Sequence, residues 1–245
     1  GANAASFGSA AHREVAREAV RRSQVLLKND GVLPIDPSAT VLVAGKTADN
    51  LGLQCGGWTV SWQGQTDGTG IAGTSIWQGI KSLAPSAELS QDGSGADAAR
   101  HDVAIVVVGE TPYAEGRGDI RASDAVLQET AAAIEGSMSP LEAYASSMKL
   151  ADIHPEDLAC IRRVSAAGVP VVVVLVSGRP LIVDEELSEA AAFVAAWLPG
   201  TEGLGVAEPL FGHCDFEGRL PVAWVGESSG ASFPVGYGLS VATKE

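Results

Sequence analysis

Four short apolar runs set the main limit on how this chain can fold. They occupy residues 40–45 (TVLVAG), 103–109 (VAIVVVG), 169–177 (VPVVVVLVS) and 192–198 (AFVAAWL). Each is rich in β-branched residues and none alternates with polar ones, which is typical of strands buried on both faces of a parallel sheet. Predicted helices separate them, at 75–83, 122–135, 155–167 and 183–189. This alternation predicts an α/β fold, a three-layer α/β/α sandwich around a mostly parallel, doubly wound sheet.

The domain organisation follows from the same alternation of strands and helices. The 245 residues, 46% of them apolar, suffice for one sizeable core or two small ones, and no shift in composition marks a second domain. Residues 11–28 have the spacing of an amphipathic helix that ends before an Asn-Asp-Gly turn signal. We therefore expect a single domain over residues 1–245, with 1–30 as a linker helix leading in. Segment 120–153 interrupts this alternation and is predicted to be an inserted, partly helical excursion.

Charge and cysteine usage exclude several classes of protein. A formal net charge of -14 argues against nucleic acid or an anionic membrane as the main partner. No run of 18 apolar residues exists, so no membrane span is predicted. Cys55, Cys160 and Cys214 lie far apart without metal-ligand spacing, which favours buried free thiols and no metal site. The glycine-rich stretches match no nucleotide-binding fingerprint, so we expect no cofactor. Because the chain starts with Gly and no signal-like segment follows, we expect a processed chain or a piece of a longer one.

The loop after the second apolar run carries candidate chemistry. Glu110, Tyr113 and Glu115 follow directly on the strand predicted at 103–109. Ligands of open α/β sheets bind beyond the carboxyl ends of the strands, so acids placed there are candidates for catalysis or binding. Glycoside hydrolysis needs two carboxyl groups, and this pair could supply both. Glu110 at the strand end is better suited to supporting the loop or contacting substrate, because two acids five apart in one loop need not face each other.

A second group of candidates follows the first apolar run. Trp58 and Trp62 stand among glycines and polar residues in the stretch 49–64. Exposed aromatic rings commonly hold the apolar face of a sugar. The alternative is that both indoles pack under a long loop. Trp77, Trp197 and Trp224 are instead predicted to belong to the core, and the four histidines lack a nucleophile elbow, which favours surface or structural roles for them.

A series of motifs in fixed order extends over nearly the whole chain. They are REAV at 17–20, LLKN at 26–29, LP at 33–34, GGWT at 56–59, WQG at 62–64, GE at 109–110, PYAE at 112–115, GD at 118–119, SGRP at 177–180, WLPG at 197–200, EG at 202–203, GRLP at 218–221, FP at 233–234 and GYGL at 236–239. In these motifs the chain resembles the C-terminal α/β sandwich domain of glycoside hydrolase family 3, the β-glucosidases and β-glucan exohydrolases.

The resemblance implies specific roles. Glu115 matches the general acid/base of a retaining enzyme that removes glucose from the non-reducing ends of β-glucosides and β-glucan oligosaccharides. Trp62 matches one side of a slot that clamps the sugar at the leaving-group subsite, with Trp58 as a wall or support. Glu110 and Tyr113 would contact substrate. The family's nucleophile is an aspartate on an N-terminal (β/α)8 barrel absent from this chain, which would therefore be inactive alone. A secreted or periplasmic location is expected from the family.

Other interpretations stay open. The insertion at 120–153 is longer than the family pattern predicts and could reshape the leaving-group subsite or contact a neighbouring subunit. Thr111 and Ala114 also depart from that pattern, which bears on chain-length preference. The branch that acts on N-acetylglucosaminides is disfavoured, because no His-Asp acid/base dyad is visible. An alternative from a different class is a non-catalytic carbohydrate-binding or interface module.

Overall fold

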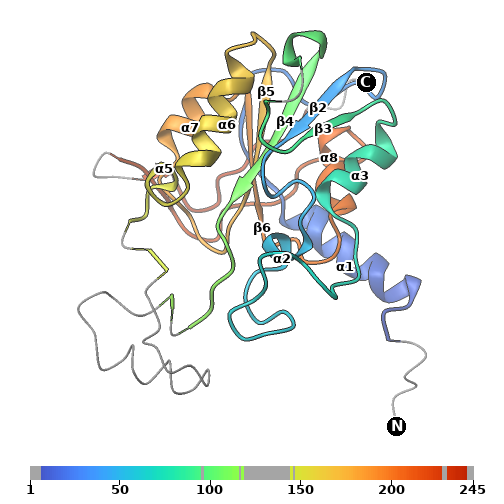
Figure 1. The fold of residues 1–245 in the computed structure, drawn as a ribbon, viewed down its shortest axis with the longest axis vertical. Helices are drawn as coiled ribbons and strands as arrows, with labels where there is room; N and C mark the ends of the chain where they lie inside the picture. Colours follow the sequence, from blue (N-terminus) through green and yellow to red (C-terminus); the bar gives the residue numbers. More distant parts are fainter. Residues whose placement is uncertain are drawn as a thin grey trace.

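The computed structural model describes residues 7–94, 97–115, 117–118, 144–145, 147–227 and 231–241, which form a three-layer α/β/α sandwich (Figure 1). The central sheet contains, in spatial order, β1 (Val25–Asn29), β6 (Ala192–Trp197), β5 (Val171–Val176), β4 (Val103–Gly109), β2 (Val41–Ala44) and β3 (Glu88–Ser90). Neighbouring strands run parallel except β1, which pairs antiparallel with β6. The predicted fold class is confirmed.

Helices cover both faces of this sheet (Figure 1). One face carries α1 (Ala10–Ser23), α3 (Ile76–Leu83) and α8 (Leu204–Leu210), and the other carries α5 (Leu150–Ile153), α6 (Pro155–Ser165) and α7 (Asp184–Glu189). In β4, Ile105 and Val107 enter the first core while Val106 and Val108 enter the second. Because successive strand residues point to opposite faces and both faces are covered, every position is apolar.

The predicted strands and most predicted helices are present. β2, β4, β5 and β6 lie within the four apolar runs. The helix predicted at 75–83 is α3, whose start is fixed by a capping box between Ser75 and Gln78. Those predicted at 155–167 and 183–189 are α6 and α7. The helix predicted at 122–135 falls outside the described residues. Of the insertion predicted at 120–153, the structure describes α5 and a few residues before it.

The helix predicted over residues 11–28 is wrong beyond Ser23. Gln24 is extended, with ψ of 124°, and the chain continues as β1. Leu26 enters the core on one face of the sheet, whereas Val25 and Leu27 enter the core on the other. Three consecutive apolar residues can be buried in this way only by the alternation of a strand. Residues 25–29 therefore form a strand that pairs antiparallel with β6, and this pairing prevails over the helical spacing of their apolar residues.

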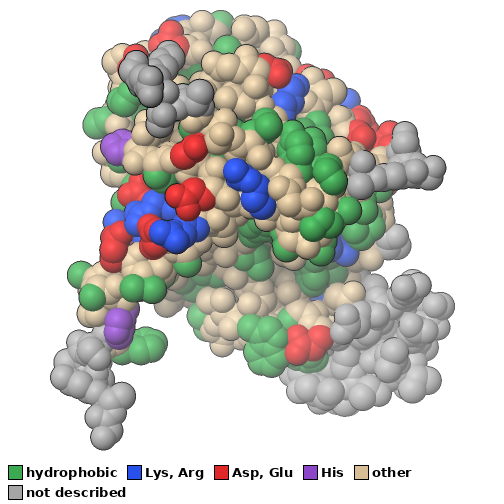
Figure 2. Space-filling view, turned by 180° about the vertical axis from the view of Figure 1, so that it is seen from behind, with side chains coloured by type: hydrophobic (Ala, Val, Ile, Leu, Met, Phe, Trp, Pro, Cys, Tyr) green, Lys and Arg blue, Asp and Glu red, His purple; other side chains and the backbone are tan. Residues whose placement is uncertain are grey.

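Ion pairs fix α1 against the rest of the sandwich. Arg21 lies 2.8 Å from Glu208 on α8, and Arg13 lies 2.9 Å from the buried carboxylate of Glu202. Figure 2 shows basic and acidic side chains interleaved on this side of the molecule. Several short elements were not predicted from the sequence: α2 (Leu51–Cys55), β3, the 3-10 helix η2 (Ala98–Arg100), α8, and the two-stranded ribbon of β7 (Trp224–Val225) and β8 (Ala231–Phe233).

Candidate active site

The candidate residues meet at the point in the sheet where the order of strand addition reverses, between β2 and β4. From β2 the chain first adds β3 on one side and then returns to place β4 on the other. The loops after β2 and β4 consequently leave the sheet side by side at its carboxyl edge, which is where open α/β sheets bind ligands. The first loop carries Trp58 and Trp62, and the second carries Glu110, Tyr113 and Glu115. The structure thus brings the two predicted groups together.

A hydrogen bond joins the two loops at Glu115. The indole Nε1 of Trp58 donates to Oε2 of Glu115 at 2.8 Å, and both side chains are exposed. The rings of Trp58 and Trp62 lie 6.4 Å apart, centroid to centroid, at 50°. Trp58 is 68% exposed, as expected for a binding surface rather than a core residue. Trp62 is half-buried.

The tryptophan loop has a strained backbone. Trp58 and Val60 adopt φ values of 59° and 66°, in the left-handed region that side chains with a Cβ rarely enter. For the β-branched Val60 this conformation is especially unfavourable. The turn is closed by a hydrogen bond of 2.9 Å from Trp58 N–H to the Trp62 carbonyl. Strain of this kind persists where the surroundings determine the conformation, and it is common at ligand sites.

Gln63 connects the tryptophan loop to the backbone of the Glu115 loop. Its Oε1 accepts from Ala114 N–H at 2.9 Å, and its Nε2 donates to the Glu115 carbonyl at 2.9 Å. The side chain is 8% exposed, so these bonds satisfy polar groups that water would otherwise have to reach. Gln63 was not among the site residues predicted from the sequence. Its position directly after Trp62, inside the WQG motif, was the available signal.

Glycines allow the two loops to approach closely. A Cβ at Gly57 would clash with the carbonyl oxygen of Tyr113, and one at Gly64 would meet Pro112. Gly64 also has a φ of 79°, which favours glycine. These positions therefore require glycine for the backbone contact that places Glu115 beside the indoles.

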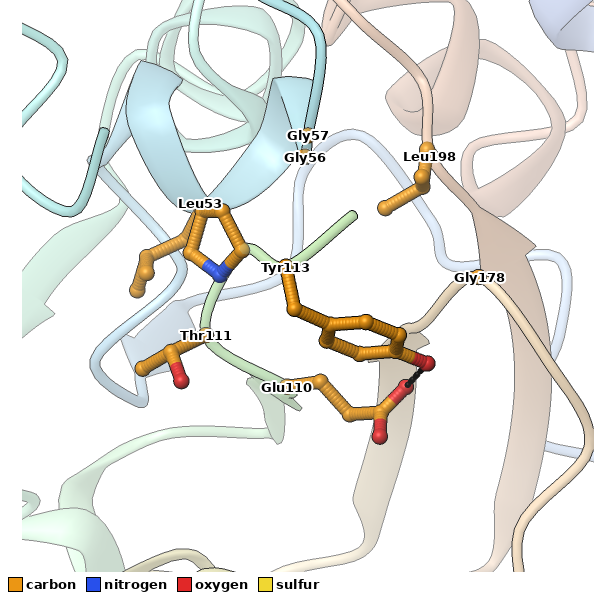
Figure 3. Close-up of a pocket in the computed structure, with 9 residues that line it drawn as sticks. Leu53, Gly56, Gly57, Glu110, Thr111, Tyr113, Gly178 and Leu198 are labelled. Carbon is orange, nitrogen blue, oxygen red and sulfur yellow. Dashed lines mark hydrogen bonds between the residues drawn. The ribbon is translucent and has the colours of Figure 1, made fainter. Parts of the chain in front are cut away.

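Glu110 has a different environment from Glu115. It is 4% exposed, and its Oε1 accepts from Arg179 Nη2 at 2.8 Å and from Arg179 Nε at 3.1 Å. The Tyr113 hydroxyl donates to Oε2 at 3.3 Å, as Figure 3 shows. Burial raises the pKa of Glu110 above its ordinary value, while Arg179 and Tyr113 oppose that rise. Arg179 was not a predicted site residue and stood out in the sequence only as part of the SGRP motif.

A small pocket lies between these loops and the ends of β5 and β6 (Figure 3). Its volume is about 220 Å³. It is lined by Leu53, Gly56, Gly57, Glu110, Thr111, Pro112, Tyr113, Gly178 and Leu198. The Glu110 carboxyl group is the charged group on an otherwise mostly apolar wall, a combination that suits a ligand with both CH and hydroxyl surfaces.

The pKa of Glu115 is shifted in the opposite direction from that of Glu110. Hydrogen bonds from its own backbone N–H and from the Trp58 indole hold the pKa of Glu115 below its ordinary value. In this exposed setting the carboxylate form is favoured. The two acids therefore lie in distinct environments, one buried and ion-paired and the other at the surface beside two indoles.

Other predicted features are as follows. Among the residues that the structure describes, no group of three or more His, Cys, Asp or Glu side chains could hold a metal ion. All three cysteines are free, with Cys55 and Cys160 buried and Cys214 half-buried. Within the described parts of the chain, no helix is long and apolar enough to cross a membrane.

Comparison with known proteins identifies the family of this domain. The sequence pattern of the glycosyl hydrolase family 3 C-terminal domain matches residues 24–241. The chain belongs to this family. Relatives of this family 3 C-terminal domain include the periplasmic beta-glucosidase of Salmonella typhimurium, 30% identical over 95% of this chain and 35% of that protein, and the lysosomal beta glucosidase of Dictyostelium discoideum, 29% identical over 94% of this chain and 27% of that protein.

Solved structures show the same fold. The family 3 C-terminal domain superposes on the exo-1,3/1,4-beta-glucanase of a Pseudoalteromonas species with a TM-score of 0.78 at 38% identity, covering 95% of this chain and 29% of that one. A beta-glucosidase of Listeria innocua, 21% identical with a TM-score of 0.72 over 98% of this chain and 35% of that one, shares the fold. The family 3 C-terminal domain described here thus spans about a third of the length of these relatives.

Proposed function

We propose that this domain supplies the general acid/base, Glu115, and the sugar-binding indoles of Trp58 and Trp62 to a retaining, exo-acting β-glucosidase or β-glucan glucohydrolase. The observation that carries the proposal is the exposed Glu115 carboxylate, hydrogen-bonded at 2.8 Å to an exposed tryptophan at the carboxyl edge of the sheet. An acid that must reach the oxygen between two sugars has to lie at a surface open to substrate, beside groups that hold the ring.

In the proposed reaction an N-terminal barrel domain of the same enzyme contributes the nucleophile. Retaining glycosidases place their two carboxyl groups about 5 Å apart, one attacking the sugar while the other protonates the leaving oxygen. Glu115 would give its proton to that oxygen and later take one from water. Because the proposed nucleophile belongs to that barrel domain and not to residues 1–245, this domain should be inactive alone.

The pKa of Glu115 has to rise for this role. In the domain by itself the hydrogen bonds from its own N–H and from Trp58 lower that pKa. A covering domain would remove water from Glu115 and bring the negatively charged nucleophile near, and both changes raise the pKa of a carboxyl group. The proton-donating state is thus proposed to depend on assembly of the two domains.

Glu110 and Tyr113 are proposed to contact substrate and to support the loop. The Glu110 carboxyl group is ion-paired to Arg179, which favours its charged form, and that form can accept from sugar hydroxyls but cannot donate a proton. The names of the relatives favour β-glucosides and β-glucan oligosaccharides as substrates. Because one of these relatives is described as periplasmic, we propose a periplasmic or secreted location.

The test uses Glu115→Ala in the complete two-domain enzyme. Activity on disaccharides should fall by at least about 10², the loss expected for a general acid. A dinitrophenyl glucoside should still form the intermediate, because its leaving group needs no proton. Added azide should then accelerate turnover and yield a β-glucosyl azide.

Glu110→Ala serves as the matched control and should show no azide rescue. Rescue at Glu110 instead of Glu115 would mean that the acid/base has been assigned to the wrong carboxylate. A non-catalytic carbohydrate-binding role would be favoured if azide rescued neither variant. It would also be favoured if Glu115→Ala weakened sugar binding but lowered activity equally on disaccharides and on dinitrophenyl glucoside.

A further inference from the structure

Tyr144 holds the Glu115 loop on both sides of the acid. Its hydroxyl oxygen accepts from Thr111 N–H at 2.9 Å, four residues before Glu115. Its own backbone N–H donates to the Arg117 carbonyl at 3.1 Å, just after Glu115. Tyr144 lies in the segment predicted as an insertion, so part of that insertion contacts the catalytic loop directly.

The ring of Tyr144 adds a third contact. It stacks on Tyr113, with centroids 4.3 Å apart and an interplanar angle of 25°. Tyr113 also contacts the buried ion pair, since its hydroxyl donates to Glu110 and the Arg179 guanidinium lies 5.3 Å from its ring centroid. The loop is therefore fixed between Tyr144 and the Glu110–Arg179 pair.

His154 determines how Tyr144 can hydrogen-bond. Its Nδ1 lies 3.0 Å from the Glu156 carboxylate, and its Nε2 lies 2.8 Å from the Tyr144 oxygen. A carboxylate only accepts, so Nδ1 carries the proton of the neutral ring and Nε2 accepts from the Tyr144 O–H. The Tyr144 oxygen then keeps its lone pairs for Thr111 N–H.

Protonation states agree with this direction of bonding. His154 is 8% exposed, and burial lowers its pKa, which favours the neutral ring. Burial also raises the pKa of Tyr144 to about 12, so the phenol keeps its proton. Glu156 is itself held by Lys46 Nζ at 2.7 Å.

We propose that Tyr144, oriented by His154, is a positioning residue that sets the location of Glu115 relative to the substrate oxygen. The inference rests on the proposed acid/base role of Glu115 and deepens it. Tyr144 does not touch the reacting atoms. It acts by fixing the backbone at Thr111 and Arg117 and the ring of Tyr113 around the acid, and proton transfer depends steeply on such placement.

The first experiment compares Tyr144→Phe with Tyr237→Phe in the complete enzyme. Tyr144→Phe keeps the stacked ring and loses only the hydroxyl. Tyr237→Phe removes a hydroxyl that donates to the Leu27 carbonyl at 3.1 Å, far from the acid. For Tyr144→Phe, kcat/KM on alkyl glucosides should fall roughly five- to tenfold and that on dinitrophenyl glucoside less than about twofold. For Tyr237→Phe the two substrates should change equally.

A second measurement is independent of catalysis. In residues 1–245 the Thr111 amide should exchange with solvent deuterium at least about fivefold faster in Tyr144→Phe, because it loses its acceptor. In Tyr237→Phe the exchange rate of that amide should stay at the wild-type value.

The outcomes separate this inference from the proposed function. Equal losses on both substrates for Tyr144→Phe, or unchanged Thr111 exchange, would overturn the positioning role while azide rescue of Glu115→Ala still supported the acid/base. If Glu115→Ala showed no rescue, the proposed function would fail and the catalytic part of this inference with it, even with Thr111 exchange accelerated. The inference is supported if Tyr144→Phe lowers kcat/KM more on alkyl glucosides than on dinitrophenyl glucoside and also speeds exchange of the Thr111 amide.

Discussion

Trp58 and Glu115, 57 positions apart in the sequence, share a hydrogen bond of 2.8 Å from the indole Nε1 to the carboxylate Oε2. This bond links a residue expected to contact sugar to the residue expected to transfer the proton. It also stabilises the charged form of the acid, which opposes the protonated state that catalysis requires. The relationship therefore makes the pKa of Glu115 a measurable property of the site.

Trp58→Phe should raise the pKa of Glu115 towards its ordinary value in the isolated domain. The wild-type pKa is lowered by the backbone N–H of Glu115 and by the Trp58 indole, and the substitution removes the second donor. Carboxyl-carbon NMR titration of residues 1–245 measures the change. Trp77→Phe, in a residue of α3 that packs against the core, should leave that titration unaltered. An unchanged Glu115 pKa in Trp58→Phe would show that the indole does not stabilise the carboxylate.

Gln63→Glu should disturb the loop that carries Glu115, although the two side chains have the same shape. The new second oxygen would face the Glu115 carbonyl, where Nε2 now donates at 2.9 Å. We expect a loss of about 1–3 kcal/mol in the free energy of unfolding, because one bond becomes a repulsion and a buried acceptor loses its donor. Urea unfolding of residues 1–245 measures it.

Gln78→Glu is the matched control for that substitution. The Gln78 side chain uses Oε1 to accept from Ser75 N–H in the capping box, a role that glutamate fills equally well. The control should change stability by less than about 0.5 kcal/mol. Equal effects of the two substitutions would argue that Gln63 does not link the loops.

Arg179→Met should destabilise the domain most at neutral pH. Glu110 would lose its cation while remaining buried, a change that costs about 3–5 kcal/mol for a fully buried pair and less here, because the Arg179 side chain is 30% exposed. Burial already raises the pKa of Glu110, and without Arg179 that pKa should rise further. For an acid whose folded pKa is raised, the stabilising contribution is present below the unfolded pKa and is lost as pH rises through the folded pKa.

The difference between wild type and Arg179→Met should consequently be small at about pH 4 and grow up to about pH 7. Chemical denaturation at a series of pH values tests this. Arg162→Met removes an exposed pair with Glu185, which solvent screens, and should change the free energy of unfolding little at any pH in the series. A loss in Arg179→Met that does not depend on pH would mean that Glu110 is not left as an unpaired charge.

Trp62→Ala and Trp77→Ala should have opposite effects. In the complete enzyme, Trp62→Ala should weaken the use of oligosaccharides by about 1–2 kcal/mol through lost stacking. Trp77 packs from α3 against the core, so its removal should lower stability by about 2 kcal/mol and leave kcat/KM of the folded fraction nearly unchanged. Kinetics on a disaccharide and thermal unfolding of both variants distinguish them. The reverse pattern would mean that site and core have been exchanged.

Much of the fold was predictable because its signals are local. Each buried strand appears as an unbroken apolar run, since helices cover both faces of the sheet. The loop of Glu110 and Glu115 could be predicted as a candidate site because it directly follows a buried strand. Trp58 and Trp62 could be predicted as candidates because glycines flank them. The motif series that includes these residues identified the family that the comparison confirms.

The rest depended on contacts between residues far apart in the chain. The helical spacing of residues 25–28 was overridden by an open sheet edge beside β6. The partners of Glu110 and of the Glu115 backbone, Arg179 and Gln63, lie 69 and 52 positions away. Which of two neighbouring glutamates is buried and which is exposed is likewise decided by these partners. The sequence by itself determined the strands, the loops and the types of residue at the site, whereas their protonation and orientation were decided only by tertiary packing, because pKa values and hydrogen-bond directions depend on burial and on distant neighbours.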